Sequence, residues 1–190
     1  MKSDRDRWNS RYYEDSGKTT PPPDQLLTDC SYMLSSGRAL DLACGKGGNS
    51  IFVARLGYWV DSLDISFTAL RILQAQVHAE KLPIGCAVVD LDYYLAPVNF
   101  YDLIMIFYFF SSNLMSTIRS ALKPGGLLIY ATFNYNHKNI RPNFCDDYLV
   151  PPGGLGKFFP DLEAVMEVEN YGPDGNISRF VGKGCGWKRS

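Results

Sequence analysis

The segment from Ala39 to Ser50, ALDLACGKGGNS, constrains the fold more than any other part of the chain. Its first residues are apolar apart from Asp41, which predicts a short buried strand that carries one acid. The next five residues, 44–48, include three glycines and favour neither a strand nor a helix. Apolar residues then recur at helical spacing from Ile51 to Leu56. A strand, a glycine-rich turn and a helix in this order place backbone N–H groups and a helix N-terminus beside a ligand at the carboxyl edge of a parallel sheet.

The composition favours one soluble, cytoplasmic domain. The length of 190 residues suits a single domain with a sizeable core, and a net charge of -1 gives no overall attraction to nucleic acid or anionic membranes. The five cysteines form no C-x-x-C pair, which favours free thiols over a disulfide framework or a zinc site. The charged, aromatic N-terminus is unlike a signal peptide, and the apolar run 103–110 is far shorter than the roughly 20 residues of a membrane span.

The rest of the chain predicts alternating strands and helices. An N-terminal helix with Trp8 and Tyr12 on one face either packs on the domain or forms a lid, and three prolines, 21–23, end it. Asp24 is expected to cap a helix from Gln25 to Leu34. Further strands are predicted at 58–64, 85–89, 101–107 and 127–133, with helices at 48–56, 67–80 and 113–122 and a tight turn at 123–126.

The C-terminal part predicts a long irregular loop and a hairpin. Residues 134–152 show no periodicity, and a loop of that length is usually functional. A short helix at 155–159 precedes two strands, 163–171 and 177–182, joined by the turn sequence GPDGN. We therefore predict a Rossmann-like α/β fold: a doubly wound, mixed seven-stranded sheet of five parallel core strands plus an antiparallel hairpin, flanked by helices. One domain would span 1–190, with 1–23 as the N-terminal helix or lid and 24–190 as the core.

Acids are predicted at the ends of two neighbouring strands. Asp64 ends the second strand, where dinucleotide-type sites place an acid that accepts hydrogen bonds from a ribose diol. Its alternative role is to cap the following helix, although Ser66 could also do this. Asp90 ends the third strand, again where a parallel sheet places polar ligand contacts.

Two phosphate-binding fingerprints fail at the glycine turn. The P-loop requires G-x-x-x-x-G-K-[ST], whereas Lys46 precedes Gly47 here, which disfavours ATP cleavage. The nicotinamide fingerprint G-x-G-x-x-G has Ala43 at its first glycine and the wrong final spacing, so a nicotinamide dehydrogenase is a distant alternative.

In combination, these features resemble the class I S-adenosylmethionine-dependent methyltransferases. The resemblance rests on DLACGKG at 41–47, Asp64, the Asp90-Leu91 pair and LKPGG at 122–126, and it extends from Trp8 to about Val181. It implies S-adenosyl-L-methionine as the cofactor, with the backbone at Ala43 and Gly45 beside its methionine part. The further roles that it implies are ribose binding for Asp64, adenine contacts for Ile65, Asp90 and Leu91, and a place near the sulfur for Phe107.

Within that family, the chain is similar to the tellurite-resistance methyltransferase group. The similarity rests on W-N-x-R-Y at 8–12, ALDLACGxGxN at 39–49 and DYLVPPGGL at 147–155. It implies that Arg11 or Tyr12 covers the methionine end of the cofactor. The complete set of expected cofactor-binding residues is Arg11, Asp41, Ala43, Gly45, Gly47, Asn49, Asp64, Ile65, Asp90, Leu91 and Phe107.

The acceptor side is predicted from the chemistry of the cofactor. A sulfonium methyl is already activated, so the protein mainly aligns the acceptor, and a base is needed only where the acceptor loses a proton. The N-P-P-[YF] motif of nucleic-acid base methyltransferases is replaced by FYFF at 107–110. Phe109 and Phe110 are expected either in the acceptor pocket or in the core. Tyr108 is the candidate for orienting the acceptor or handling its proton. Tyr12, Tyr135, His137 and Arg141, together with Phe144, are candidates for the acceptor pocket, although His137 and Arg141 could equally be ordinary exposed side chains.

The sequence therefore predicts a methyltransferase that acts on a small-molecule acceptor, with a thiol or a metalloid oxyanion as examples. Two alternatives remain: methylation of RNA or protein with a partner subunit, and a cofactor-binding module without catalysis. We expect no metal site, no membrane or nucleic-acid partner, and a monomer or homodimer.

Overall fold

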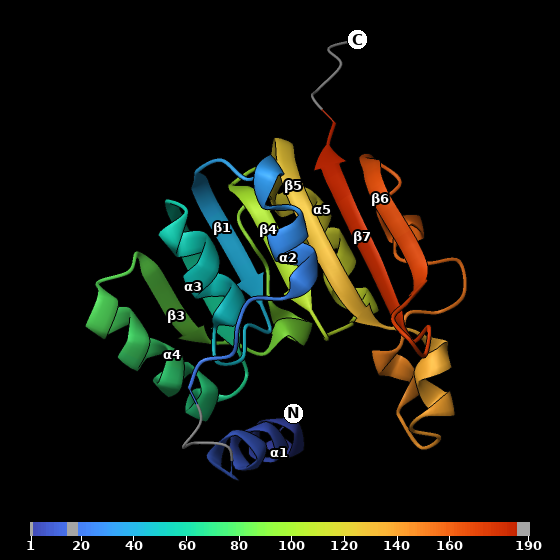
Figure 1. The fold of residues 1–190 in the computed structure, drawn as a ribbon, viewed down its shortest axis with the longest axis horizontal. Coiled ribbons are helices and arrows are strands. Elements are labelled where there is room, and N and C mark those ends of the chain that lie inside the picture. Colours follow the sequence, from blue (N-terminus) through green and yellow to red (C-terminus); the bar gives the residue numbers. More distant parts are fainter. Residues whose placement is uncertain (1, 15–18, 186–190) are drawn as a thin grey trace. The chain divides into compact units, whose positions relative to one another are not determined.

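The computed structural model describes residues 2–14 and 19–185 (Figure 1). Its seven strands form one mixed sheet in the order β3-β2-β1-β4-β5-β7-β6, which confirms the predicted fold class. Contacts divide the chain into two compact units, residues 1–94 and 95–190, and each is described by itself below. One domain spanning residues 1–190 remains a prediction.

Among its described residues, the first unit holds three parallel strands and four α-helices. The strands are β1 (Gly37–Leu42), β2 (Tyr58–Asp64) and β3 (Ile84–Val88), and β2 pairs with both of the others. The helices are α1 (Lys2–Glu14), α2 (Gln25–Asp29), α3 (Gly48–Arg55) and α4 (Phe67–Glu80). Leu73 and its neighbours Ile51 and Leu70 form a buried cluster between α3 and α4. The predicted strands, and the helices predicted at 48–56 and 67–80, agree with these bounds to within two residues. Helix α1 ends at Glu14, before the prolines at 21–23 that are predicted to end it, and α2 also differs from the prediction.

The helix expected from Gln25 to Leu34 is shorter than predicted. Asp24 caps it as expected, by accepting a hydrogen bond from the Leu26 amide at 2.8 Å, but α2 ends at Asp29. A single 3-10 turn follows at Ser31–Met33. Leu26, Leu27 and Cys30 are buried, whereas Tyr32 is 81% exposed. A short helix is stabilised mainly by burying an apolar face. Because Tyr32 is exposed, little burial stabilises α-helical turns beyond Asp29.

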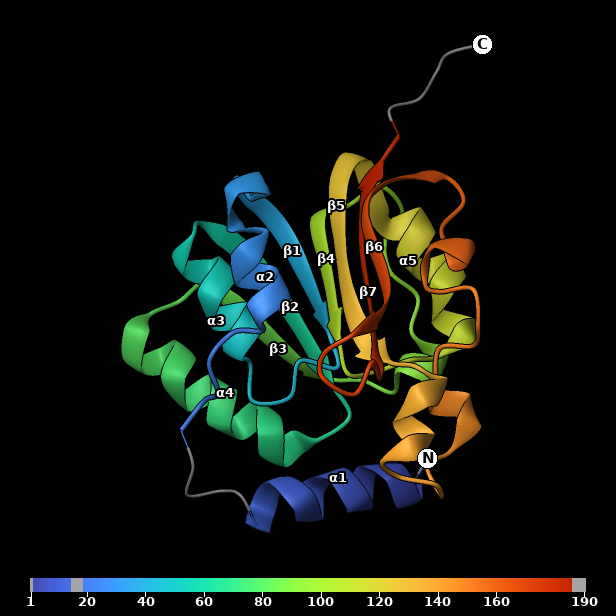
Figure 2. The same ribbon diagram turned by 45° about the vertical axis from the view of Figure 1, so that its right-hand side comes forward.

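The second unit holds four strands and one α-helix. β4 (Tyr101–Phe107) and β5 (Leu122–Phe133) are parallel, and β7 (Ile177–Gly184) pairs antiparallel with both β5 and β6 (Leu162–Tyr171). Helix α5 (Met115–Ala121) lies on one side of these strands in both ribbon views (Figures 1 and 2). Single 3-10 turns occupy Leu91–Tyr93 in the first unit and Ser112–Leu114, Tyr135–Asn139, Asp146–Tyr148 and Gly156–Phe158 in the second.

Two expectations in the second unit are corrected. The helix predicted over 113–122 begins as the 3-10 turn Ser112–Leu114, and only α5 is α-helical. The turn predicted at 123–126 lies inside β5, which begins at Leu122. Tyr101 pairs with Leu122 while Leu103 pairs with Leu127, so the extra residues of β5 are taken up by an irregularity in the pairing.

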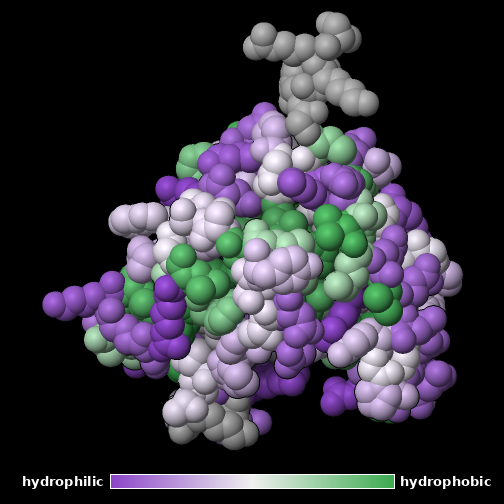
Figure 3. Space-filling model, turned by 45° about the horizontal axis from the view of Figure 1, so that its top comes forward, coloured by the Kyte–Doolittle hydropathy of each residue, from purple (hydrophilic) through white to green (hydrophobic). Residues whose placement is uncertain are grey.

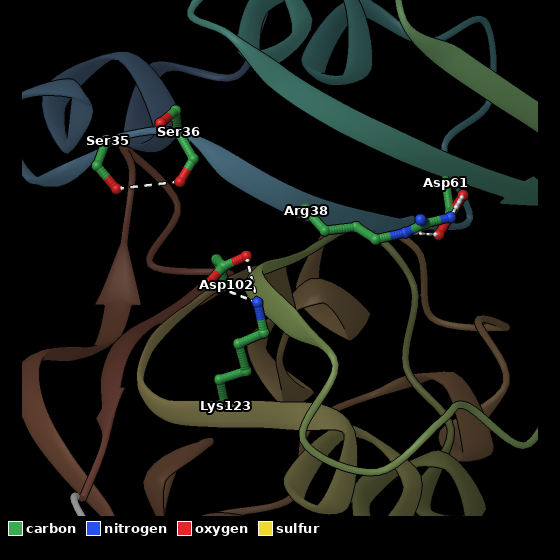
Figure 4. Close-up of polar contacts among 6 residues, drawn as sticks. All are labelled: Ser35, Ser36, Arg38, Asp61, Asp102 and Lys123. Carbon is green, nitrogen blue, oxygen red and sulfur yellow. Dashed lines mark hydrogen bonds and ion pairs between the residues drawn. The ribbon is translucent and has the colours of Figure 1, made fainter.

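Ion pairs fix the early residues of neighbouring strands (Figure 4). Arg38 of β1 donates to both carboxylate oxygens of Asp61 of β2, at 2.9 and 3.0 Å. In the second unit, the Lys123 ammonium lies 2.8 and 2.9 Å from the two oxygens of Asp102. All four side chains are partly exposed, so each pair adds register specificity more than stability. The figure also shows the Ser35 hydroxyl donating to the Ser36 carbonyl oxygen.

Within the described ranges, no helix combines the length and the apolar character needed to cross a membrane.

Two glycines with nearly the same φ allow a test of packing at the glycine turn. Gly47 has φ 78°, and a Cβ there would overlap Leu73 Cδ1, whereas a Cβ on Gly125, with φ 77°, would have nothing within 4 Å. Gly125→Ala should cost about 1 kcal/mol of unfolding free energy from backbone strain alone. Gly47→Ala should cost roughly 3 kcal/mol, because overpacking of the buried Leu73 is added. Urea unfolding of both variants measures the difference, and equal losses would contradict this packing.

Candidate cofactor and acceptor sites

The glycine turn between β1 and α3 has three residues in the left-handed conformation. They are Ala43, Gly45 and Gly47, with φ of 56°, 54° and 78°. The Gly45 amide donates to Asp64 Oδ2 at 2.8 Å, and the Cys44 amide donates to the Leu63 carbonyl oxygen at 3.0 Å. The turn is therefore tied to the last residues of β2, as expected for a ligand loop at the carboxyl edge of the sheet.

Asp64 is buried at the end of β2, with 6% of its surface exposed. Its Oδ1 accepts a hydrogen bond from the Ser66 amide at 2.8 Å. Ser66 itself caps α4, because its hydroxyl oxygen accepts from the Ala69 amide, so the alternative capping role falls to Ser66. Burial raises the pKa of Asp64, and hydrogen bonds from backbone amides, led by that of Ser66, oppose the rise. A carboxylate has about four acceptor positions, so a position that the backbone amides do not use can accept from a ribose hydroxyl.

Asp41 supports the turn from inside the protein. It is 1% exposed, and the Ser50 hydroxyl of α3 donates to its Oδ2 at 2.5 Å. The Ser62 hydroxyl of β2 donates in turn to Ser50 Oγ at 2.8 Å. Burial raises the pKa of Asp41 to about 7; the Ser50 hydrogen bond lowers it, and the negative charge of Asp64 raises it. Asp41 thus holds β1, β2 and α3 together beneath the turn.

Helix α1 covers the turn with an aromatic side chain. A Cβ on Gly45 would lie 2.7 Å from the Tyr12 hydroxyl oxygen, so Tyr12 occupies the space that a side chain would need. The Trp8 and Tyr12 rings stack, with their centroids 5.9 Å apart. Asn9 Oδ1 accepts hydrogen bonds from the Ser66 hydroxyl at 2.9 Å and the Thr68 amide at 3.2 Å, which binds α1 to the start of α4. Sequence reasoning missed Asn9, although it is the polar residue inside the W-N-x-R-Y motif.

Other residues of the predicted cofactor set have structural contacts of their own. Asn49 Oδ1 accepts from the Asp24 amide at 2.8 Å and so fixes the segment before α2. Arg11 is exposed, with its guanidinium carbon 5.1 Å from the Trp8 ring centroid. Lys46, which is not in the predicted set, is buried and places its ammonium 6.0 Å from the Tyr12 ring centroid. Cofactor contacts of Asn49 and Arg11 remain predictions.

The end of β3 lies beside the end of β2. The Val89 amide donates to the Asp64 carbonyl oxygen at 3.0 Å. Asp90 accepts from the Asp92 amide at 3.2 Å and begins the 3-10 turn that holds the buried Leu91, while Ile65 is half-buried. The structure therefore brings Gly45, Asp64 and Asp90 to neighbouring strand ends.

A separate groove of about 570 Å³ lies along α4, and none of the predicted cofactor residues lines it. Its lining residues are Tyr13, Thr19, Thr20, Thr68, Arg71, Ile72, Ala75, Gln76 and Ala79.

In the second unit, Tyr108 follows β4 in a strained conformation. Its φ is 55°, which costs an L-residue about 1 kcal/mol or more and is typical of functional sites. Its side chain is 48% exposed, and its ring centroid lies 5.4 Å from that of Phe133. Phe107, just before it, is buried at the end of β4. Phe110 is also buried and packs against Phe158, as the core alternative predicted.

His137 belongs to an aromatic cluster rather than to the exposed surface. It is 6% exposed and stacks on Phe133 with centroids 4.0 Å apart, while Phe144 packs edge-on at 4.8 Å. Its Nδ1 lies 3.0 Å from Asn176 Nδ2. Burial and the charge of Arg141 lower the pKa of His137, so the ring is neutral at pH 7. With Nδ1 accepting from the amide, the proton resides on Nε2.

The two remaining acceptor candidates are exposed. Arg141 is exposed, and its backbone amide donates to the His137 carbonyl oxygen at 2.9 Å. Tyr135 is 40% exposed, with the Lys138 ammonium 5.9 Å from its ring centroid. His137 is therefore not an exposed side chain, whereas Arg141 is exposed, and the role of each in an acceptor pocket remains a prediction.

The first unit fits S-adenosylmethionine better than a phosphate ligand. The turn offers backbone that a ligand can approach closely, and the adjoining buried group is a carboxylate, which repels phosphate and accepts from hydroxyls. Among the described residues, no group of three or more acidic, cysteine or histidine side chains could hold a metal ion.

The pKa of Asp41 predicts a pH dependence of stability. Because the folded state raises this pKa from 3.8 to about 7, the stabilising contribution of the protonated group is complete below about pH 4 and is lost as the pH rises to about 7. The slope is at most about 1.4 kcal/mol per pH unit. Asp41→Asn stays neutral, so urea unfolding between pH 4 and 7 should show a flatter profile than for the wild type. An unchanged slope would contradict the assignment.

Comparisons with known proteins place the chain in a family. The family model described as "Tellurite resistance protein TehB" matches residues 7–172. Two curated proteins from Haemophilus influenzae strains, each called "Probable S-adenosyl-L-methionine-dependent methyltransferase TehB", are 33% identical over 66 residues. That alignment covers 35% of this chain and 23% of each relative, so the chain aligns with less than a quarter of the curated proteins it matches.

Solved structures share the fold at low sequence identity. The crystal structure of TehB from Haemophilus influenzae superposes with a TM-score of 0.73 at 18% identity, covering 93% of this chain and 67% of that one. Phosphoethanolamine N-methyltransferase 2 from Haemonchus contortus, in complex with S-adenosyl-L-methionine, gives a TM-score of 0.67 at 18% identity, with coverages of 85% and 52%. A methyltransferase from Clostridium acetobutylicum gives 0.68 at 14% identity, with coverages of 85% and 89%. Because the family model matches most of the 190 residues, this chain belongs to the TehB family.

Proposed function

We propose that this chain is an S-adenosylmethionine-dependent methyltransferase that acts on a small-molecule acceptor. One observation carries the proposal: the buried Asp64 carboxylate at the end of β2 is bonded to the glycine turn through the Gly45 amide and keeps lone pairs for a diol. Membership of the TehB family, and the names of the curated relatives, support the same chemistry.

The first unit would bind the cofactor. The turn at 43–47 takes the methionine part, because its glycines let the backbone approach a ligand closely. Asp64 accepts from both ribose hydroxyls, and Ile65 and Leu91 contact the adenine, with Asp90 near its amino group. Tyr12 and Arg11 of α1 cover the methionine end, and Asn9 holds α1 in place through Ser66 and Thr68.

The second unit would supply the groups that orient the acceptor. The bound cofactor provides an activated methyl group, so the protein needs mainly to align the acceptor and exclude water. Tyr108 offers a half-exposed hydroxyl whose ring is held by Phe133. His137 offers a neutral ring whose position is fixed by Asn176 and Phe133. Phe107, buried at the end of β4, remains a candidate of this unit, and Tyr135 and Arg141 contribute from exposed positions.

A small acceptor fits the charge and the aromatic content better than a nucleic acid does. The net charge is -1, and the candidate residues that follow β4 and β5 are mainly aromatic. The structural neighbour from Haemonchus contortus is named for a small acceptor, phosphoethanolamine. Methylation of RNA or protein with a partner, and binding of the cofactor without catalysis, are the alternatives that the experiment below separates.

A methyl-transfer screen tests the activity. The chain is incubated with S-adenosylmethionine tritiated in its methyl group and with small thiols, selenium and tellurium oxyanions, or a metabolite extract. We expect label in a small-molecule product, and a rate at least roughly 10-fold lower for Tyr108→Phe with unchanged cofactor affinity. Tyr148→Phe, a matched change elsewhere in the second unit, should keep the wild-type rate. Label only in RNA or protein would contradict the acceptor class, and tight binding with no transfer to any fraction would contradict catalysis.

Cofactor affinity tests the ribose contact. Asp64→Asn keeps an acceptor oxygen but removes the charge, and it should weaken S-adenosylmethionine binding by at least about 2 kcal/mol, because charge-assisted hydrogen bonds to the diol are lost. Asp61→Asn is the control, since Asp61 lies on the same strand but pairs with Arg38. Calorimetry on both variants measures the difference. Equal affinities would show that the nucleoside binds elsewhere, and tighter binding of NADH than of S-adenosylmethionine would favour a dehydrogenase.

A further inference from the structure

Arg179 of β7 is a buried cation whose side chain has no anionic partner within the part of the chain that the structure describes. It is 8% exposed, and its Nε is buried with no hydrogen-bond acceptor. Across residues 2–14 and 19–185, its one polar or ring contact is with Tyr171 of β6, whose ring centroid lies 3.2 Å from the guanidinium carbon. By contrast, the exposed Arg119 of the same unit is paired with Asp161.

This arrangement is costly unless a ligand completes it. A guanidinium stays charged at any physiological pH, so it cannot avoid burial by losing its proton. Stacking on a tyrosine ring offsets only part of the cost of removing the charge from water. Five N–H donors in a planar fork, one of them buried and unbonded, therefore point to an anion that binds here.

Arg179 shares a face of the sheet with residues proposed for the acceptor. It pairs with Ala131 of β5, whose carbonyl oxygen accepts from the Tyr108 amide at 2.8 Å. Phe133, two residues further along β5, is its diagonal neighbour on the same face. The hairpin is held at this end because the Asn134 amide donates to the Asn176 carbonyl oxygen at 3.0 Å, and Asn176 contacts His137.

The surroundings of Arg179 on the hairpin are apolar. Val168 pairs with Arg179 and Met166 with Val181, so both side chains lie on the Arg179 face, where they are 38% and 37% exposed. In Figure 1 this hairpin faces the viewer while α5 lies behind it, and Figure 3 shows hydrophobic surface in its centre and just right of it, bordered by hydrophilic surface further right. A single guanidinium beside apolar side chains matches a singly charged carboxylate on an apolar body, because its fork can bond both carboxylate oxygens.

We propose that Arg179 binds the carboxylate of a small organic acceptor and so selects it. The proposal rests on the proposed function, since it names the chemical class that the acceptor side takes. Tyr171 stacks on the guanidinium and fixes its plane, and Met166 and Val168 contact the apolar body of the acceptor.

The test uses benzoate as the probe, with benzamide as its neutral counterpart and inorganic phosphate and selenite as inorganic anions. Each is titrated by calorimetry into the full chain loaded with S-adenosylhomocysteine. Wild type should bind benzoate at least 10-fold more tightly than benzamide, phosphate or selenite. Arg179→Met should lose that preference, Arg179→Lys should keep part of it, and the control Arg119→Met should bind like wild type.

The stability of Arg179→Met is a second measurement. If Arg179 had a purely structural role, its replacement would lower the stability of the chain. Without a carboxylate present, Arg179→Met should unfold at the same or a higher urea concentration than wild type, since an unpaired buried charge is replaced by an apolar side chain. Benzoate should raise the thermal midpoint of wild type and of Arg119→Met, and leave that of Arg179→Met unchanged.

The outcomes separate this inference from the proposed function. Benzoate binding within twofold of wild type in Arg179→Met, equal binding of benzoate and benzamide, or a preference for phosphate or selenite would overturn the carboxylate assignment. So would a marked loss of stability in Arg179→Met. In each of these cases the wild type would still bind S-adenosylmethionine and transfer its methyl group. Failure of cofactor binding in wild type, with the benzoate preference intact, would instead overturn the proposed function.

Discussion

The hydrogen bond from the Gly45 amide to Asp64 is the contact on which the cofactor site depends. It joins the glycine turn to the end of β2 at 2.8 Å and leaves the carboxylate with lone pairs for a ligand. The same carboxylate accepts from Ser66, and Ser66 donates to Asn9 of α1. The helix that covers the turn is therefore positioned by the residues that would bind the ribose. Opening of α1 and loss of order at the turn should be coupled through these contacts.

Two buried acids lie close together at this site, and they have different roles. Burial and the charge of Asp64 raise the pKa of Asp41 to about 7, so Asp41 can stay protonated near neutral pH. A protonated Asp41 reduces the repulsion that an ionised Asp64 would otherwise meet. The serine hydroxyls of α3 and β2 satisfy Asp41 from within, while Asp64 is satisfied by backbone amides at the rim. We infer that burial of Asp41 lowers the stability of the folded chain, and that it favours a charged Asp64 where the diol binds.

The sequence predicted those parts of the fold that local patterns determine. Periodicity located β2, β4 and α4 with their observed bounds, and the glycine turn and Asp64 followed from their positions at strand ends. The early end of α2 and the irregular start of β5 depend on burial and pairing between segments distant in the chain, which local patterns do not record. Contacts between distant segments also determine three features of the sites. These are the bonding of Asn9 to α4, the burial of His137 and the position of Arg179. A lone arginine in a strand gives no sequence signal that its guanidinium lies on a tyrosine ring.

The most direct test of the account is a crystal structure of the chain grown with S-adenosylhomocysteine. We predict that both ribose hydroxyls lie within hydrogen-bonding distance of Asp64, while its Oδ2 still accepts from the Gly45 amide. We also predict that the homocysteine part lies along the turn at 43–47, beneath Tyr12. A nucleoside bound away from Asp64, or a turn that releases the Gly45 hydrogen bond to admit the ligand, would contradict the account.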